Sequence, residues 1–373
     1  MRKCWLSRGI SKKQFLKWLR YDKIQQIKRN MGNNQLTKAF LIVALLVIFS
    51  IGITSANTAS QNQNFSIIVL PDTQHYSESY PWIFTNQTQW IIDNMDELNI
   101  KFVIHEGDIV EDANDDTQWN RANKSMSVLD GKVPYGILPG NHDENITEYE
   151  EYFPAERYGN YSYWGGSCDH NTNNYQLFSG LGMDFIVINL GWKPDSDDII
   201  WANEILKSYS ERKAIVVTHG YMDKRATREI PQFDSSYIWN DLIVPNRNVF
   251  LVLCGHTHSE AGRMDVIDER TVHQLLADYQ DRPNGGDGWL RIIEFRENKT
   301  KASNLDLVIK TYSPFLNKYE TDEDSQFELR EELQCPSLLD ISLSKIEIRL
   351  ERLKINFMSI LKGVLFIKVI KNA

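Results

Sequence analysis

The sequence predicts an α/β protein whose largely parallel β-sheet is covered by helices. Between residues 66 and 138, short apolar runs alternate with helical patterns in the order β-α-β-α-β, which is typical of parallel sheets. Five apolar runs along the chain end abruptly in Asp, Asn or His, often beside Gly. Because polar groups just beyond the carboxyl ends of strands line the ligand crevice of open α/β sheets, we expect one shared site there.

The elements follow from the apolar runs and their period. Helices are expected at residues 90–98, 119–129 and 197–209, where apolar residues recur every three or four positions. Strands are expected at 66–70, 102–104, 133–138, 175–178, 185–189, 214–217, 249–253, 271–276, 289–295 and 305–312. Residues 144–166 form an aromatic, polar insert whose rings either pack beneath a loop, which we favour, or line a substrate cleft.

The N-terminal region has the pattern of an export sequence. Residues 1–38 are basic, residues 39–56 combine an apolar core with small residues, and Met31 is an alternative start. The apolar core spans residues 39–53, fewer than the roughly 20 residues that cross a bilayer comfortably. We therefore favour a cleaved signal sequence over a membrane anchor, and expect an exported protein that is extracellular or attached to the outer face of a membrane.

The C-terminal region, residues 337–373, predicts one amphipathic helix. Its apolar residues recur at spacings of three and four from Ile346 to Ile367, while Lys362 and Lys368 argue against a membrane-spanning segment. Two interpretations are equally good. The helix docks on the domain or on a second copy, giving an oligomer, or residues 346–370 lie on a membrane surface.

The charge distribution excludes one class of partner. Residues 1–38 contain eleven of the 41 Lys and Arg but one of the 50 Asp and Glu, so the remainder carries 30 − 49 = −19 charges. Nucleic-acid-binding surfaces need clustered Lys and Arg. We therefore expect no nucleic-acid partner.

Seven donor side chains follow the predicted strands, and their chemistry indicates metals. They are Asp72, Gln74, Asp108, Asn141, His219, His256 and His258. This set is too large for one tetrahedral zinc ion but suits two divalent cations that share a bridging carboxylate. Asp108, in the middle of the sheet, is the expected bridge. Such a pair would activate water to hydroxide and clamp the oxygens of an in-line displacement, which is phosphoester hydrolysis.

His142 follows Asn141 directly and is therefore expected next to the metals without being a ligand. An imidazole in that place can protonate a leaving alkoxide. The carboxylate of Asp143 could hold its ring. We accordingly predict His142 and Asp143 as catalytic residues.

Several motifs in this order resemble the calcineurin-like metallophosphoesterase family over residues 65–315. The motifs are Asp72-x-Gln74, Gly107-Asp108, Gly140-Asn141-His142-Asp143, Thr218-His219 and Gly255-His256-Thr257-His258. The resemblance implies a β-sandwich flanked by helices, with a dinuclear metal centre at the carboxyl ends of the strands. It also implies that one metal takes Asp72, Gln74, Asp108 and His258, that the other takes Asp108, Asn141, His219 and His256, and that His142 is the proton donor.

The first motif departs from the family's usual pattern. Most relatives have His where this chain has Gln74, and the Pro-Asp-Thr-Gln form resembles one branch of the family; His75 could compete as a ligand. An amide oxygen is a harder ligand than imidazole, which favours manganese, magnesium or calcium there. Two divalent ions are expected, manganese first among Mn, Fe, Zn, Mg and Ca. Relatives usually have a second Asp three residues after the position of Asp108, and this chain has Glu111 there.

The predicted function is metal-dependent hydrolysis of a phosphoester whose identity the sequence does not give. A catalytically idle binding protein that keeps the fold is the first alternative. It is disfavoured because every expected ligand and His142 are retained, apart from the exchange at Gln74. A hydrolase of pyrophosphate bonds is the second alternative.

Overall fold

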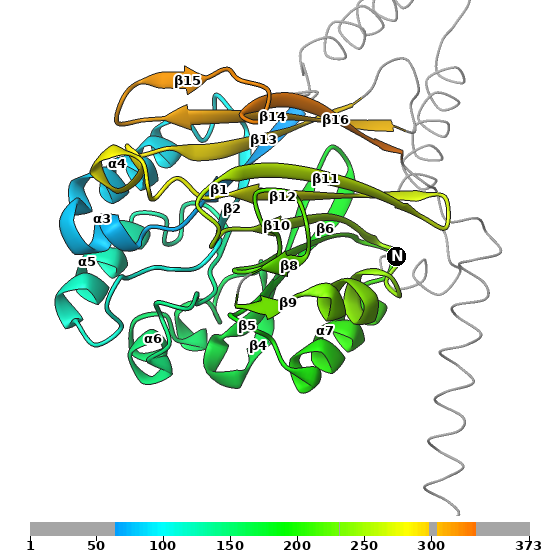
Figure 1. The fold of residues 1–373 in the computed structure, drawn as a ribbon, viewed down its shortest axis with the longest axis horizontal. Coiled ribbons are helices and arrows are strands. Elements are labelled where there is room, and N and C mark those ends of the chain that lie inside the picture. The colour runs from blue at the N-terminus through cyan, green and yellow to red at the C-terminus, as the bar shows by residue number, and fades with distance from the viewer. Residues whose placement is uncertain (1–63, 231, 298–303, 333–373) are drawn as a thin grey trace, which may run out of the picture. The chain divides into compact units, whose positions relative to one another are not determined.

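The computed structural model describes residues 64–230, 232–297 and 304–332, and these form two β-sheets with helices against them (Figure 1). The predicted segments 1–38, 39–56 and 337–373 lie outside the described residues. No helix within the described part is long and apolar enough to cross a membrane.

The first sheet has seven strands in the order β15-β14-β13-β1-β2-β3, with β16 also paired to β14. The strands β1, β2 and β3 are parallel to one another, and the other pairs are antiparallel. Their bounds are β1 (Asn64–Leu70), β2 (Ile100–His105), β3 (Tyr135–Gly136), β13 (Leu290–Glu297), β14 (Asn304–Ser313), β15 (Lys318–Glu320) and β16 (Gln326–Glu332).

The second sheet has the order β11-β12-β10-β7-β6-β5-β4, and its parallel strands are β6, β7, β10 and β12. Its strands are β4 (Trp164–Cys168), β5 (Asn173–Gly180), β6 (Met183–Leu190), β7 (Lys213–Thr218), β10 (Val249–Cys254), β11 (Glu260–Ile267) and β12 (Arg270–Ala277). A short hairpin pairs β8 (Glu229–Ile230) with β9 (Phe233–Asp234).

The two sheets face each other across an apolar core. In β1, Ile67 and Val69 point into this core and pack in one cluster with Val187 of β6 and Leu253 of β10. Alternate residues of the same strand, such as Ile68, pack on the opposite side against helices. Because β1 is buried on both faces, its sequence is continuously apolar, as in covered parallel strands. Each such side chain contributes about 1.5–3 kcal/mol by its burial.

Helices cover the outer face of each sheet, which completes a four-layer α/β/β/α sandwich. Helices α3, α4, α5 and α6 pack against the first sheet, whereas α7 and the π-helical segment η4 pack against the second. Their bounds are α3 (Gln74–Ser79), α4 (Pro81–Asp93), α5 (Asp116–Met126), α6 (Ile146–Tyr152), α7 (Ser196–Ser208) and η4 (Ile238–Ile243). Three further short turns are η2 (Ala155–Arg157), η3 (Asp169–Asn171) and α8 (Pro283–Gly286).

Local sequence explains where the longer helices begin. Pro81 occupies the first turn of α4, where its missing N–H costs nothing. The carboxylate of Asp115 accepts the Thr117 N–H at the start of α5. A capping box joins Asp195 and Asp198 at the start of α7, and caps of this kind contribute about 1 kcal/mol each.

The sandwich confirms the expected α/β class, but the sheet arrangement is more mixed than the alternation of elements suggests. The β-sandwich that the family resemblance implies is confirmed, but the expectation of a largely parallel sheet is wrong, because antiparallel strands extend both sheets. The expected strand at 133–138 shrinks to the two residues of β3, and β15 and β16 carry the first sheet beyond residue 315.

The aromatic insert at 144–166 contains the helix α6 as well as irregular chain. Tyr149, Phe153 and Tyr158 are fully buried in the core against the first sheet. Packing is therefore the role of these three rings, as expected, and they do not line a cleft.

Candidate metal centre

The carboxyl ends of the parallel strands carry the predicted ligands. Asp72 and Asp108 follow the neighbouring strands β1 and β2, and Asn141 follows β3. His219 follows β7 and His256 follows the adjacent strand β10 in the second sheet. The two sheets thereby deliver their polar groups to one shared edge of the sandwich.

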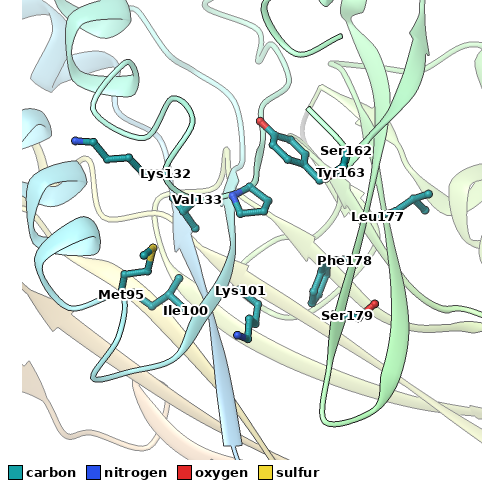
Figure 2. Close-up of a pocket in the computed structure, with 11 residues that line it drawn as sticks. Met95, Ile100, Lys101, Lys132, Val133, Ser162, Tyr163, Leu177, Phe178 and Ser179 are labelled. Atoms are coloured by element: carbon teal, nitrogen blue, oxygen red, sulfur yellow. The ribbon is translucent and has the colours of Figure 1, made fainter. Parts of the chain in front are cut away.

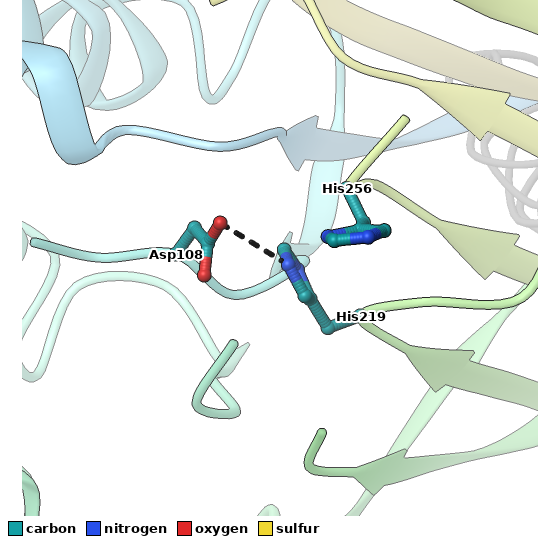
Figure 3. A group of neighbouring side chains, drawn as sticks. All are labelled: Asp108, His219 and His256. Atoms are coloured by element: carbon teal, nitrogen blue, oxygen red, sulfur yellow. Dashed lines mark ion pairs between the residues drawn. The ribbon is translucent and has the colours of Figure 1, made fainter. Parts of the chain in front are cut away.

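Three predicted ligands form a compact cluster. Ligand atoms of Asp108, His219 and His256 all lie within 4.8 Å of one another. Figure 3 shows the His219 ring between the other two side chains, with its Nε2 3.2 Å from Asp108 Oδ2. The amide oxygen of Asn141 lies 3.0 Å from the same Nε2. These four side chains are the set expected for one of the two metals.

The surroundings of His219 prepare its ring for a metal. Its Nδ1 lies 2.9 Å from the backbone oxygen of Glu106, to which it can donate its proton. Nε2 is then the nitrogen with the lone pair, and it faces Asp108. A histidine that donates one ring N–H to a carbonyl while the other nitrogen coordinates is the usual arrangement at metal sites.

Two glycines permit the close approach of the carboxylates. A Cβ atom on Gly140 would lie 2.1 Å from Asp108 Oδ1, and one on Gly255 would lie 2.1 Å from Asp72 Oδ1. The Asp72 carboxylate also accepts the backbone N–H of His256, at 3.0 Å. The glycines of the Gly-Asn-His-Asp and Gly-His-Thr-His motifs therefore make room for ligands from the first sheet.

The charge of this edge fits divalent cations. Asp72 and Asp108 are buried, with 3% and 2% of their surface exposed. Burial and the nearby carboxylates of Asp278 and Asp108 hold the pKa of Asp72 well above its usual value. Carboxylates gathered in a low-dielectric interior need positive charge to remain ionised. Bound cations would supply it.

The side chain of Gln74 is a second test of whether this edge suits a bound cation. Its side chain is completely buried, yet neither its amide nitrogen nor its amide oxygen has a hydrogen-bond partner among residues the structure describes. Buried polar groups are almost always paired. The amide oxygen of Gln74, two residues after Asp72 in the chain, is suited to a cation. His75, the competing residue, lies 3.6 Å from Glu111 Oε2 and 3.5 Å from Glu78 Oε2.

His258 lies apart from the cluster of Asp108, His219 and His256. Its side chain is 41% exposed, and its Nδ1 lies 2.8 Å from Asp281 Oδ2. Its Nε2 contacts the side chain of Gln280. The structure therefore brings Asp108, Asn141, His219 and His256 together and places the side chain of His258 outside this group.

The structure gives Asp143 a different role from the one expected. Its carboxylate accepts backbone N–H groups of Ile109, Val110 and Gly140 at 2.8–3.0 Å. Asp143 thus fixes two loops to each other instead of holding the ring of His142.

The ring of His142 lies beside Glu111. Its Nδ1 is 3.0 Å from the backbone oxygen and 3.5 Å from the carboxylate of that residue. The backbone N–H of His142 donates to Asp108 Oδ1 at 2.8 Å. Burial works to lower the pKa of His142, but Asp108 and Glu111 raise it overall. Glu111 is therefore the residue that orients the ring.

A cavity of about 490 Å³ opens beside His142. Its lining is mostly polar and acidic and consists of Glu111, Asp112, Ala113, Asn114, Asn141, His142, Glu144 and Asn145. The Trp192 ring lies 4.6 Å from the His256 ring and 5.5 Å from the His219 ring, between centroids. The candidate centre is thus bordered by an acidic cavity and by the indole ring of Trp192.

A second cavity, of about 290 Å³, contains none of the predicted site residues (Figure 2). Ile100 and Lys101 at the start of β2 line it, together with Lys132 and the Phe178 region of β5. Since the predicted ligand follows the end of β2, this cavity lies at the opposite end of that strand.

Sequence reasoning missed three buried or half-buried acids at this edge: Glu106, Glu111 as the partner of His142, and Asp278. Asp278 directly follows the apolar strand β12, just as the predicted ligands follow theirs. That repetition could have identified it. The sequence places Glu111 where the family usually has Asp, but it does not predict the contact with His142, because that contact joins two separate loops.

Comparison with known proteins agrees with this geometry. The sequence profile of the calcineurin-like phosphoesterase family matches residues 65–260. The uncharacterized protein YvnB of Bacillus subtilis (strain 168) is 40% identical over 274 residues, which are 69% of this chain and 21% of that protein. The chain therefore spans about a fifth of the length of this curated relative.

Two solved structures are similar at lower levels. A purple acid phosphatase from yellow lupin (Lupinus luteus) seeds is 13% identical, with a TM-score of 0.47. The match covers 73% of this chain and 54% of the phosphatase chain. A dimetal phosphatase from Danio rerio has 10% identity and a TM-score of 0.47, covering 72% and 99%. Both similarities are too weak to add to the family match. On the profile match over more than half of its length, this chain belongs to the calcineurin-like phosphoesterase family.

Proposed function

We propose that this protein is a metal-dependent phosphoester hydrolase, that it uses two divalent cations, manganese foremost, and that His142 is its general acid. The observation that carries the proposal is the cluster of Asp108, His219 and His256, whose ligand atoms lie within 4.8 Å of one another. The unpartnered amide of Gln74 and the buried carboxylate of Asp72 support a second cation beside it.

The residues of the chain have separate tasks. Asp108 would contact both cations, with Asn141, His219 and His256 on one and Asp72, Gln74 and His258 on the other. When bound, the cations would supply Lewis-acid polarisation of the phosphoryl group and a water nucleophile active near neutral pH.

His142 would complete the reaction by donating a proton to the leaving oxygen. Its backbone N–H is fixed on Asp108, and its ring Nδ1 is fixed beside Glu111. The opposite ring nitrogen, Nε2, is then the proton donor. A proton donor so placed is worth about 10²–10⁴ in rate when the leaving group is a poor one.

The charge of the cavity beside His142 indicates which class of substrate the site accepts. A leaving group would occupy the 490 Å³ cavity, where Glu111, Asp112 and Glu144 supply carboxylates. These carboxylates would repel an anionic leaving group. We propose a neutral or cationic alcohol as the leaving group, in keeping with the expected absence of nucleic-acid substrates.

The test is hydrolysis by the full chain after removal of metal and addition of manganese. The substrates are an aryl phosphate monoester, the matching diester and a pyrophosphate. We expect turnover in the parent, loss of at least 10³-fold in Asp108→Ala, and full turnover in the surface control Asp96→Asn. Manganese binding without cleavage of any substrate would instead favour the idle binding protein, and selective cleavage of pyrophosphate would favour the other alternative.

We also propose that the protein acts outside the cytoplasm, on the basis of the predicted export sequence at 39–56. Fractionation of cells that produce the full chain with a C-terminal tag checks this. Recovery of the chain in the cytoplasm alone would contradict the proposal.

A further inference from the structure

Asp278 extends the pattern that defines the candidate metal centre. It directly follows β12, which lies next to β10 and runs parallel to it. Parallel neighbours present their carboxyl ends at the same edge of a sheet. Asp278 therefore emerges beside His256 and His258, which follow β10.

The carboxylate of Asp278 is buried and only half satisfied. None of its side-chain surface is exposed. Oδ1 accepts the backbone N–H of Gln280 at 3.0 Å, whereas Oδ2 has no hydrogen-bond partner within the described part of the chain. An unpaired carboxylate oxygen in the interior is unfavourable unless a proton or a cation meets it.

The nearest imidazole nitrogen is oriented toward the same place. His258 Nε2 lies 4.0 Å from Asp278 Oδ2, and Nδ1 of the same ring lies 2.8 Å from Asp281 Oδ2. A ring that donates from Nδ1 to a carboxylate keeps its lone pair on Nε2, the usual state of a metal ligand. Two ligand atoms that each lie about 2.1 Å from one ion are about 3.0–4.2 Å apart. The 4.0 Å between His258 Nε2 and Asp278 Oδ2 falls in that range.

Other groups at the same strand ends belong to this site. The Asp72 carboxylate accepts the backbone N–H of His256, which follows β10, the strand paired with β12. Gln280 Oε1 is buried and lacks a hydrogen-bond partner in the described chain, as do both amide atoms of Gln74. The side-chain nitrogen of Gln280 contacts His258 Nε2, and a cation bound to Nε2 would replace this contact. Buried, unpaired polar groups thus follow β1 and β12, the strands that also precede Asp72 and Asp278.

We propose that Asp278 is a further ligand of the cation held by Asp72, Gln74 and His258, and that Asp281 is a positioning residue that orients His258. The proposal rests on the proposed two-metal function. This cation would then have two carboxylates that do not bridge the metals, one amide oxygen and only one imidazole among its ligands. Such a ligand set favours hard cations, so Mn²⁺, Mg²⁺ or Ca²⁺ should bind here in preference to Zn²⁺.

The test is Mn²⁺ binding by the full chain, without substrate. Calorimetric titration gives the number of sites and their affinities, and electron paramagnetic resonance shows whether two ions are magnetically coupled. We expect two coupled sites in the parent and in the surface control Asp96→Asn. In Asp278→Asn, one site should weaken about 10- to 100-fold, the other should remain, and the coupling should disappear at limiting Mn²⁺.

Two further variants separate coordination from folding. Asp278→Glu keeps a carboxylate and should retain more of the weakened site than Asp278→Asn does. Asp281 is 72% exposed, so Asp281→Asn should leave the fold intact and still weaken the same site.

The outcomes distinguish the two proposals. Two unchanged, coupled sites in Asp278→Asn would overturn the role of Asp278 and leave the proposed function standing. Absence of Mn²⁺ binding in the parent would overturn both. In a third outcome, Asp278→Asn and Asp278→Glu lower the Mn²⁺ affinity of both sites equally. This would show a general loss of structure and would also contradict a ligand role for Asp278.

Discussion

The ring of His142 is oriented by Glu111, whose backbone oxygen lies 3.0 Å and whose carboxylate lies 3.5 Å from its Nδ1. Asp143 is adjacent to His142 in sequence, but both of its carboxylate oxygens accept backbone N–H groups. Glu111 reaches the ring from another loop. Neighbouring residues in a turn point in different directions, so adjacency alone does not predict which side chains touch.

At the residue scale, His142→Ala tests the proton donor. We expect Mn²⁺ content to be unchanged and turnover to fall about 10²–10⁴-fold for alkyl esters with poor leaving groups, because these need protonation. Aryl esters with good leaving groups should lose much less. The measurement is kcat over a series of leaving groups of rising pKa.

The matched control is His170→Ala, which removes an exposed histidine that pairs with Glu150. It should behave as the parent for every ester. A uniform loss across the leaving-group series in His142→Ala would remove its role as general acid and leave only a part in substrate binding.

At the scale of elements, Glu294 joins three strands of the first sheet. It lies on β13 and accepts hydrogen bonds from Asn64 on β1 at 2.6 Å and Lys310 on β14 at 2.9 Å. Arg296, two residues along β13, adds a third at 2.8 Å. Burial would raise the pKa of Glu294, but these hydrogen bonds lower it from 4.5 to about 2.

This shift predicts a pH dependence of stability. Because the folded-state pKa is below the unfolded-state value, the stabilisation is complete above about pH 4.5 and is lost as the pH falls toward 2. Glu294→Gln should lower the free energy of unfolding by about 1–2 kcal/mol at pH 7. Urea denaturation at pH 7 and pH 3 checks this.

The difference between parent and Glu294→Gln should be smaller at pH 3 than at pH 7. Glu328→Gln, on β16, which is separated from β13 by β14, is the control and should show no such trend. A constant difference at both pH values would mean that the Glu294 charge contributes nothing to holding the strands together.

At the scale of the whole molecule, the candidate metal centre ties the two sheets together. Asp72 and Asp108 come from the first sheet, whereas His219 and His256 come from the second. Cations bound only in the folded state stabilise it by mass action, by about 2.7 kcal/mol at 100 times the dissociation constant. Saturating Mn²⁺ should raise Tm by about 5–10 °C over the chelated protein.

Differential scanning calorimetry of the full chain, with chelator and then with Mn²⁺, measures this change. Asp108→Ala should lose most of the increase, since it removes the shared ligand. A Tm that is the same with and without Mn²⁺ in the parent would contradict cations as a link between the sheets.

The sequence by itself determined the family, the strands that carry the site and the identity of most candidate ligands. These features are local: an apolar run followed by Asp, Asn or His is visible within ten residues, and burial of β1 on both faces makes its run continuous. The Gly-Asn-His-Asp and Gly-His-Thr-His motifs are local as well.

Only the tertiary structure decided how the strands divide into two sheets, which carboxylate faces His142, and that Asp278 lies beside His258. These features depend on pairings between residues far apart in the chain, such as β1 with β13 and β10 with β12. A local pattern sets where a strand begins and ends, but the partner of a strand is chosen by the packing of both its faces. That choice is made only when the whole core assembles.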